Sequence, residues 1–162
     1  MFGQLVPMVS VRKATFPQDE TEVLSIWREF VASPSVDLGF QGYEDEFANL
    51  PGKYGAPTGC LLLGTVVGSV QGCVGFRRVN TEICEMKRLY VRPSARGHGL
   101  GRRLVEDLIA EARNAGYGEI RLDVLAEFEA ARKLYTDMGF EPAEPVSHNP
   151  LADTTFLGLR IP

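Results

Sequence analysis

Apolar residues recur at helical spacing in the second half of the chain, most clearly over residues 99–115. Charged side chains occupy the positions between them, which is the pattern of an amphipathic helix with one face on a core. Gly116 follows, and glycine is the usual residue just after a helix end. The apolar positions of this predicted helix are Leu104, Val105, Leu108, Ile109 and Ala112.

Three other segments also show helical spacing. Pro17 stands at the expected first position of one of them, where proline is favoured because its missing N–H is not needed. Pro51 and Gly139 follow the other two and are typical of residues beyond a helix end. The predicted helices span residues 17–32, 43–50 and 127–138, with a loop over 33–42.

Runs of apolar and β-branched residues lie between the predicted helices, and these runs predict strands. In one run Ile120, Leu122 and Val124 alternate with polar residues, as in a half-buried strand. Two others meet at Val67-Gly68 and predict a β-hairpin. The predicted strands span residues 8–14, 60–66, 69–79, 82–91, 119–125, 140–143 and 154–161.

The resulting order, β-α-α-β-β-β-α-β-α-β-β, predicts an α/β fold with a mixed central sheet flanked by about four helices. The chain has 162 residues, and no repeat or linker divides it. That length is typical of one domain, so residues 1–162 are expected to form a single domain. With 44% hydrophobic residues, the chain can bury a core.

Composition indicates the cellular setting. No run of about 18 apolar residues exists, so no membrane span is expected, and residues 1–10 lack the pattern of a secretory signal. Three cysteines without C-x-x-C spacing argue against disulfides and zinc and favour the reducing cytoplasm. We expect Cys60, Cys73 and Cys84 to pack as small apolar residues in strands. Two histidines are too few for a multi-histidine metal centre.

A strand, a glycine-rich loop and a helix start follow one another between Val91 and Val105. Glycines let the backbone turn its N–H groups toward a ligand, and the helix N-terminus adds about half a positive charge. The stretch therefore predicts a phosphate-binding loop. Gly97, Gly99 and Gly101 are two residues apart and no Lys follows, which excludes both a G-x-G-x-x-G dinucleotide fingerprint and a P-loop.

Basic residues gather around this loop, although the chain as a whole carries a formal charge of −4. No acidic residue lies between Met86 and Arg103. A cationic segment in an acidic protein indicates a local anion site and not a nucleic-acid surface, which needs a basic domain. Guanidinium forks suit the phosphates of a nucleotide. The basic residues are Lys87, Arg88, Arg92, Arg96, Arg102 and Arg103.

Two motifs carry a resemblance to a known family. The loop reads R-x-x-G-x-G from Arg96 to Gly101, and about 30 residues later Ala131 to Phe140 read A-x-x-L-Y-x-x-x-G-F. Together they resemble the GNAT superfamily of N-acetyltransferases, over about residues 60–140. Many members carry Asn seven residues before the motif tyrosine, where this chain has Phe128.

The resemblance implies that the chain binds acetyl-CoA and needs no metal. The pantetheine arm would lie between two splayed parallel strands and bond to the backbone of Leu89, Tyr90 and Val91. Phe128 and Ala131 are expected beside the cofactor, on the last helix. The loop N–H groups that would hold the pyrophosphate belong to Arg96, Gly97, His98, Gly99, Leu100 and Gly101, with Arg102 next to them.

Acetyl transfer from a thioester to an amine needs a base for the amine, donors for the oxyanion and a proton for the leaving thiolate. The resemblance implies Tyr135 as the general acid and a backbone N–H near Leu89 as the oxyanion donor. Glu85, on the strand before an expected bulge, is the predicted base, with Glu82 or a water chain as alternatives. Side chains alternate between the two faces of a strand, so Glu85 is expected on the same face as Lys87 and Leu89, unless the bulge changes this alternation.

No motif indicates the acceptor. The first hypothesis is an enzyme that acetylates a primary amine of a small molecule. The alternatives are a non-catalytic acetyl-CoA-binding module and an enzyme acting on a protein N-terminus or lysine. His148, Tyr43, Glu44 and Glu46 are candidates for acceptor contacts. Neither a nucleic acid nor a membrane is expected as a partner, and a homodimer is compatible with the resemblance because dimers are common in the family.

Overall fold

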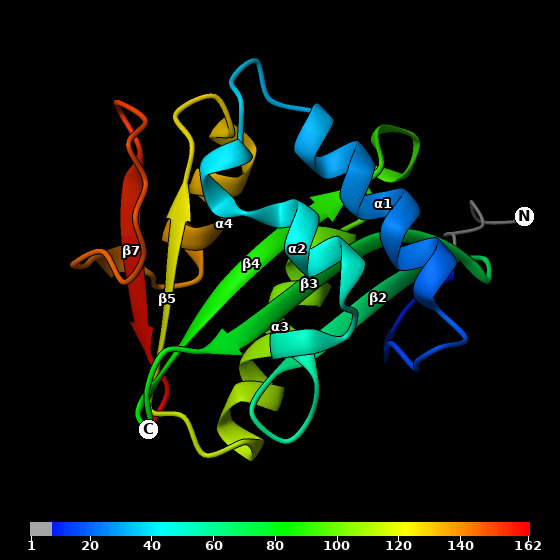
Figure 1. Ribbon diagram of the computed structural model, residues 1–162, viewed down its shortest axis with the longest axis horizontal. Coiled ribbons are helices and arrows are strands. Elements are labelled where there is room, and N and C mark those ends of the chain that lie inside the picture. The colour runs from blue at the N-terminus through cyan, green and yellow to red at the C-terminus, as the bar shows by residue number, and fades with distance from the viewer. Residues whose placement is uncertain (1–7) are drawn as a thin grey trace, which may run out of the picture.

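The computed structural model describes residues 8–162 and is built on one seven-stranded mixed sheet with strand order β1-β2-β3-β4-β5-β7-β6 (Figure 1). The helices are α1 (Glu20–Ala32), α2 (Tyr43–Ala48), α3 (Leu100–Asn114) and α4 (Glu129–Asp137), with short 3₁₀ turns at Gly39–Gln41, Gly52–Tyr54 and Pro93–Ala95. The strands are β1 (Val9–Lys13), β2 (Cys60–Val66), β3 (Ser69–Arg78), β4 (Ile83–Val91), β5 (Glu119–Val124), β6 (Glu141–Pro142) and β7 (Thr155–Arg160).

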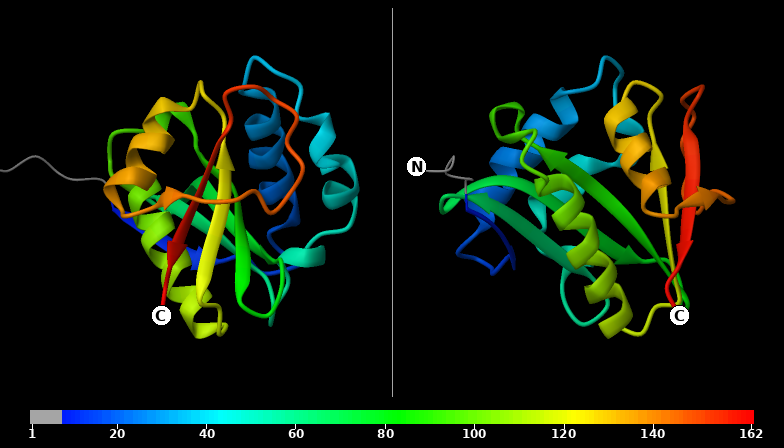
Figure 2. Two further views of the ribbon diagram at one scale, coloured as in Figure 1. Left: turned by 90° about the vertical axis from the view of Figure 1, so that its left-hand side faces the viewer. Right: turned by 180° about the vertical axis from the view of Figure 1, so that it is seen from behind.

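The sheet is covered on both faces, with α1 and α2 on one side and α3 and α4 on the other (Figure 2). Each face buries its own apolar cluster. Trp27 is fully buried in the cluster under α1, together with Leu63 of β2. Leu104 and Leu108 of α3 are fully buried in the larger cluster on the opposite face. This three-layer arrangement is the predicted α/β fold, with the predicted order of helices and strands.

The β2–β3 hairpin closes through Val67 and Gly68, as the sequence predicts. Both residues have positive φ, 50° and 79°. That backbone shape matches the right-handed twist of the paired strands. The cysteine prediction is also confirmed, because Cys60, Cys73 and Cys84 are free, buried and located in β2, β3 and β4.

The predicted start of the first helix is wrong. The helix begins at Glu20 and not at Pro17, because residues 16–19 form a turn. The Asp19 carboxylate holds this turn by accepting hydrogen bonds from the Thr15 N–H (2.7 Å) and from both terminal nitrogens of Arg12 (2.7 and 2.9 Å). A local side-chain contact thus overrides the helical tendency of the first turn. Within residues 8–162, no helix is long and apolar enough to cross a bilayer.

β4 and β5 are parallel neighbours for only a short distance. Their pairing covers Ile83–Glu85 against Glu119–Arg121 and then stops. Figure 1 shows the two strands meeting near one end and separating toward the other. The splayed parallel strands expected from the resemblance are therefore present. The backbone of β4 beyond Glu85 has a partner strand, β3, on one edge alone.

A bulge interrupts β4 where the two strands have separated. Cys73 and Gly75 of β3, two residues apart, pair with Tyr90 and Lys87 of β4, three residues apart. Arg88 lies in this bulge. Its φ of 63° is unusual for a residue other than glycine. Leu89 then packs in the cluster under α3, and Tyr90 packs in the cluster under α1. The bulge has reset the alternation, so Glu85 does not share a face with Leu89.

We expect Asp19→Asn to lower the free energy of unfolding at pH 7 by about 1–3 kcal/mol, because it removes charge-assisted hydrogen bonds. The hydrogen bonds from Arg12 hold the pKa of Asp19 well below its usual value, and the bond from Thr15 adds to this. A lowered pKa stabilises the fold fully above the unfolded pKa of about 4, and the gain disappears as pH falls toward the folded value.

Denaturant unfolding at pH 7 and at pH 3 measures the effect. The difference between wild type and Asp19→Asn should shrink on acidification, while the exposed control Asp45→Asn should leave stability nearly unchanged at both pH values. Equal stability of wild type and Asp19→Asn at pH 7 would contradict the assignment.

Candidate active site

A cleft of about 790 Å³ opens where β4 and β5 separate. Its lining comes from the second half of β4, the loop before α3, the end of β5, α4, the chain between α1 and α2, and Asn149 in the loop before β7. All of these elements surround the point where the parallel pairing stops. The cleft therefore follows directly from the splay of the two strands.

The glycine-rich loop forms one end of the cleft, with Arg96, Gly97, Gly99, Leu100, Gly101 and Arg102 in the lining. Gly97 and Gly99 have φ of 90° and 76°, a conformation that glycine adopts without strain. Gly99 is the N-cap of α3, and no side chain caps this helix end. The first N–H groups of a 15-residue helix are thus free to bind an anion. His98 is exposed and does not line the cleft.

The backbone of β4 forms one wall. The Arg92 N–H donates to the Gln71 carbonyl of the β3 side. Alternate residues of a strand direct their N–H and C=O groups to opposite edges, so Leu89 and Val91 direct theirs toward the cleft. Arg96 Nε donates to the Val91 carbonyl at 3.0 Å, and its guanidinium lies 5.8 Å from the centre of the Tyr90 ring.

Tyr135 reaches the cleft from α4 and is buried, with its ring 5.5 Å from that of Phe140. Burial raises the pKa of Tyr135 above its ordinary value, and the negative charge of Asp123 adds to this effect. The hydroxyl therefore keeps its proton at neutral pH and is a weaker acid than the hydroxyl of an exposed tyrosine. Phe128, which precedes α4, and Ala131 line the same part of the cleft.

Glu85 lies behind the cleft. Its side chain is 4% exposed, accepts a hydrogen bond from Ser147 Oγ at 2.7 Å and pairs with the Arg77 guanidinium at 3.2 Å. It does not belong to the cleft lining. Glu82 is exposed in the turn before β4, where its carbonyl accepts the Gly118 N–H, and it does not reach the cleft either.

Sequence reasoning did not consider Asp123, which lines the cleft, and it included Lys87 only among the basic residues around the glycine loop. Lys87 is 8% exposed, and burial lowers its pKa from the usual value. Asp123 accepts a hydrogen bond from Asn149 Nδ2 at 3.0 Å. We call this part, formed by Lys87, Asp123 and Asn149, the polar end of the cleft. The sequence did contain a signal for Asp123, because it is one of the polar residues that alternate with apolar residues along β5.

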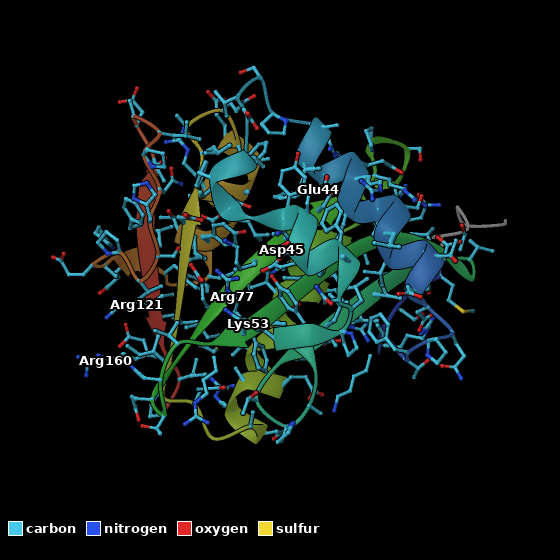
Figure 3. The ribbon with its side chains drawn as sticks, viewed as in Figure 1. Glu44, Asp45, Lys53, Arg77, Arg121 and Arg160 are labelled. Atoms are coloured by element: carbon cyan, nitrogen blue, oxygen red, sulfur yellow. The ribbon has the colours of Figure 1, made fainter. Side chains whose placement is uncertain are left out.

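Four charged side chains form a network between the sheet and α2. Glu46 pairs with Arg77 and with Arg88, both at 2.6 Å, and Arg77 continues to Glu85. The Arg88 side chain has no exposed surface, and its guanidinium lies 5.1 Å from the centre of the Trp27 ring. Figure 3 labels Arg77 beside α2, which carries Glu44 and Asp45 on its outer surface. The network holds the bulge residue Arg88 in place.

The other residues considered for acceptor contacts lie outside the lining. Tyr43 packs against Phe47 with ring centres 5.3 Å apart, and Glu44 is exposed. His148 is also exposed, in the loop whose next residue, Asn149, does line the cleft. Across the cleft from this loop, the Glu127 carboxylate accepts hydrogen bonds from the N–H (3.1 Å) and hydroxyl (2.9 Å) of Ser35. This contact joins the segment after α1 to the segment before α4.

Comparison with known proteins gives consistent results. The model of the Acetyltransferase (GNAT) family matches residues 22–140. An uncharacterized N-acetyltransferase of Schizosaccharomyces pombe is 36% identical over 155 residues, which cover 94% of this chain and 95% of the relative.

Two solved structures share the fold. An acetyltransferase of the GNAT family from Staphylococcus aureus aligns with a TM-score of 0.79 at 16% identity, covering 96% of this chain and 100% of that one. A putative acetyltransferase from Salmonella typhimurium, solved with its cofactor acetyl-CoA, aligns with a TM-score of 0.69 at 23% identity, covering 95% and 94%.

We expect Glu46→Gln to destabilise the protein by about 3–5 kcal/mol, because it leaves the buried Arg88 guanidinium without its counter-charge. Thermal or denaturant unfolding measures the loss. Glu44→Gln is the matched control on the same helix, since its side chain is 70% exposed and pairs with Arg28 only at 3.8 Å. The control should change stability by less than about 0.5 kcal/mol. Equal effects of the two substitutions would show that the network does not stabilise the fold.

Proposed function

The chain belongs to the GNAT family of acetyltransferases, and from this premise we propose that it transfers the acetyl group of acetyl-CoA directly to a primary amine of a small molecule. The observation that carries the proposal is the cleft between β4 and β5. One end has the free N–H groups of a glycine loop, and the other end has charged side chains suited to a polar acceptor. The two substrates would meet between these ends.

The loop end supports binding of the acetyl-CoA pyrophosphate. The uncapped N-terminus of α3 offers N–H donors and a favourable dipole, and Arg96 and Arg102 add positive charge. The backbone edge at Leu89 and Val91 has no partner strand and suits the amide groups of the pantetheine arm, which would extend the sheet at the splay. The Val91 carbonyl already accepts from Arg96, so the Val91 N–H and the backbone groups of Leu89 are the available ones. The Salmonella relative in the fold comparison has acetyl-CoA as its cofactor, as the proposal assigns to this chain.

The chemical step requires three contributions from the protein: a base for the amine, a donor for the oxyanion and a proton for the leaving group. The amine nitrogen loses a proton and attacks the thioester carbonyl carbon, the C–S bond breaks, and the leaving thiolate takes up a proton. An N–H of the β4 backbone near Leu89 would stabilise the oxyanion. Tyr135, which lines the cleft, would supply the proton to the thiolate.

Direct transfer is favoured over a covalent acyl-enzyme. Cys60, Cys73 and Cys84 lie in the sheet outside the cleft lining. Burial raises the pKa of each of these thiols to about 12, so their thiolates are scarce at neutral pH. No thiol of the cleft is therefore available to accept the acetyl group first.

The base that deprotonates the amine has three candidates. Glu85 is the residue proposed from the sequence, but both of its oxygens are engaged and it stands behind the cleft wall, so a proton would reach it through water or Ser147. Asp123 lines the cleft and lies close enough to Tyr135 to influence its pKa. This position favours Asp123 as the direct proton acceptor. Glu82 is exposed at the far end of β4 and is the weakest candidate.

A small acceptor is favoured over a peptide. The Ser35–Glu127 contact joins the segments that follow α1 and precede α4, and both segments border the cleft. An extended peptide would need an open groove at this position. A non-catalytic module would also bind acetyl-CoA, so only a measurement of turnover distinguishes it from an enzyme.

We expect calorimetric titration to show selective binding of acetyl-CoA over NADH and ATP. Gly99→Asp should weaken that binding by at least about 100-fold, because a carboxylate would face the pyrophosphate beside the helix N-terminus. Gly116→Asp is the matched control, since Gly116 also has positive φ (94°) and open space but follows the other end of α3. Unchanged affinity in Gly99→Asp would overturn the loop assignment.

Thiol release in the presence of a panel of primary amines then tests the reaction itself. Amine-dependent release of free CoA is the expected result. Tight binding of acetyl-CoA without release for any amine would support the non-catalytic module in its place.

We expect Asp123→Asn to lower kcat/KM by about 10²- to 10⁴-fold at pH 7, the usual contribution of a general base. Glu85→Gln should lower it less, and the exposed control Asp137→Asn should leave it unchanged. Steady-state thiol release measures all three variants, with unfolding midpoints as a check on folding. A larger loss in Glu85→Gln at equal stability would return the role of base to Glu85.

A further inference from the structure

The polar end of the cleft contains a cation, Lys87, that forms no direct ion pair within residues 8–162. Three basic side chains come from the adjoining parts of β3 and β4. Arg77 pairs with Glu46 and Glu85, and Arg88 pairs with Glu46. Lys87, by contrast, makes no ion pair within 4 Å and no side-chain hydrogen bond among residues 8–162.

The groups that face Lys87 explain why it has no partner. Glu85 precedes it on the same strand face, but its two oxygens are taken by Arg77 and Ser147. Asp123, across the splay on β5, accepts from Asn149. Glu85 and Asp123 raise the pKa of Lys87, and Arg77 and Arg88 lower it, but burial has the largest effect and lowers it.

A buried ammonium group is costly unless an anion neutralises it. Lys87 lines the cleft, so a ligand in the cleft can reach it. The cofactor phosphates are poor candidates, because the loop that would bind them begins at Arg96. This loop lies beyond Val91, and Val91 is itself four residues along β4 from Lys87, which corresponds to roughly 13 Å of extended strand.

We propose that Lys87 binds a carboxylate of the acceptor, so that the acceptor is an amino acid and not a simple amine. This inference rests on the proposed acetyl transfer. The carboxylate of the acceptor would pair with Lys87, and its amino group would lie beside the Asp123 carboxylate on the opposite strand. The polar end of the cleft then carries one group of each sign for a zwitterion, while the glycine loop at the other end offers N–H donors for an anion.

Matched acceptor pairs test the proposal: leucine against leucinamide, and phenylalanine against phenylalaninamide. The members of each pair share the side chain and differ in the carboxyl group, which is charged in the acid and uncharged in the amide. Because the amide also has a lower amino-group pKa, kcat/KM is compared for the neutral-amine form of each acceptor, from its pH dependence. For the wild-type protein, thiol-release kinetics should give a kcat/KM about 10- to 100-fold higher for the acid than for the amide. Equal values, or a preference for the amide, would overturn the inference.

Lys87→Met removes the charge and keeps an unbranched side chain that is one atom shorter. We expect it to abolish the preference for the acid, mainly through a higher KM, whereas Lys87→Arg should retain a preference. Lys53→Met is the control, because Lys53 is exposed on the turn after α2 (Figure 3). Equal losses for acid and amide in Lys87→Met would overturn the inference, since a role in folding or in oxyanion binding affects both acceptors alike.

Failure of this inference is distinguishable from failure of the proposed function. If acetyl-CoA binds and amides are acetylated as well as acids, the reaction stands and the role of Lys87 is wrong. If acetyl-CoA binds but no amine of either kind releases thiol, the proposed transfer is wrong, and the inference fails with it.

Discussion

The functional geometry of this protein depends on a parallel β-ladder that stops after three residue pairs. Between Ile83 and Glu85, β4 is hydrogen-bonded to β5, and beyond Glu85 it is not. An interior sheet edge that lacks its partner strand leaves N–H and C=O groups that require hydrogen bonds from elsewhere. A cofactor with amide groups along an extended arm can supply them. When such a cofactor binds, its arm takes the place of the missing strand beside β4.

The splay must be held open, and buried charge contributes to this. The bulge at Arg88 turns a guanidinium into the space between the sheet and α2, where Glu46 neutralises it and the rings of Trp27 and Phe47 flank it. Such a residue in the left-handed region is strained unless its surroundings determine its position. The ion pair and the aromatic contacts together keep this backbone shape. They also maintain the bulge, which changes the face of the sheet to which odd-numbered and even-numbered side chains of β4 point.

Much of the fold could be predicted because local patterns determine it. The amphipathic α3, the β2–β3 hairpin and the glycine loop each depend on residues close in sequence. The meeting of Lys87 and Asp123 could not be predicted in this way. It depends on two strands that a helix separates in sequence and on the point at which their pairing stops.

Glu85 illustrates the same limit. Its strand was predicted, but its partners Arg77 and Ser147 come from a neighbouring strand and from a loop 62 residues away. The start of α1 was missed for a local reason, because Asp19 binds Arg12 and Thr15 and holds a turn in the place of the first helical residues.

The positions of the cysteines have a consequence for chemical durability. A protein that works with thioesters is exposed to free CoA thiol and to its disulfides, and surface thiolates would exchange with them or become acylated. Here all three thiols are buried in the sheet, each with a pKa raised to about 12. At pH 7 only about one thiol in 10⁵ is ionised. The chain is thereby resistant to mixed-disulfide formation and to spontaneous S-acylation by its own donor.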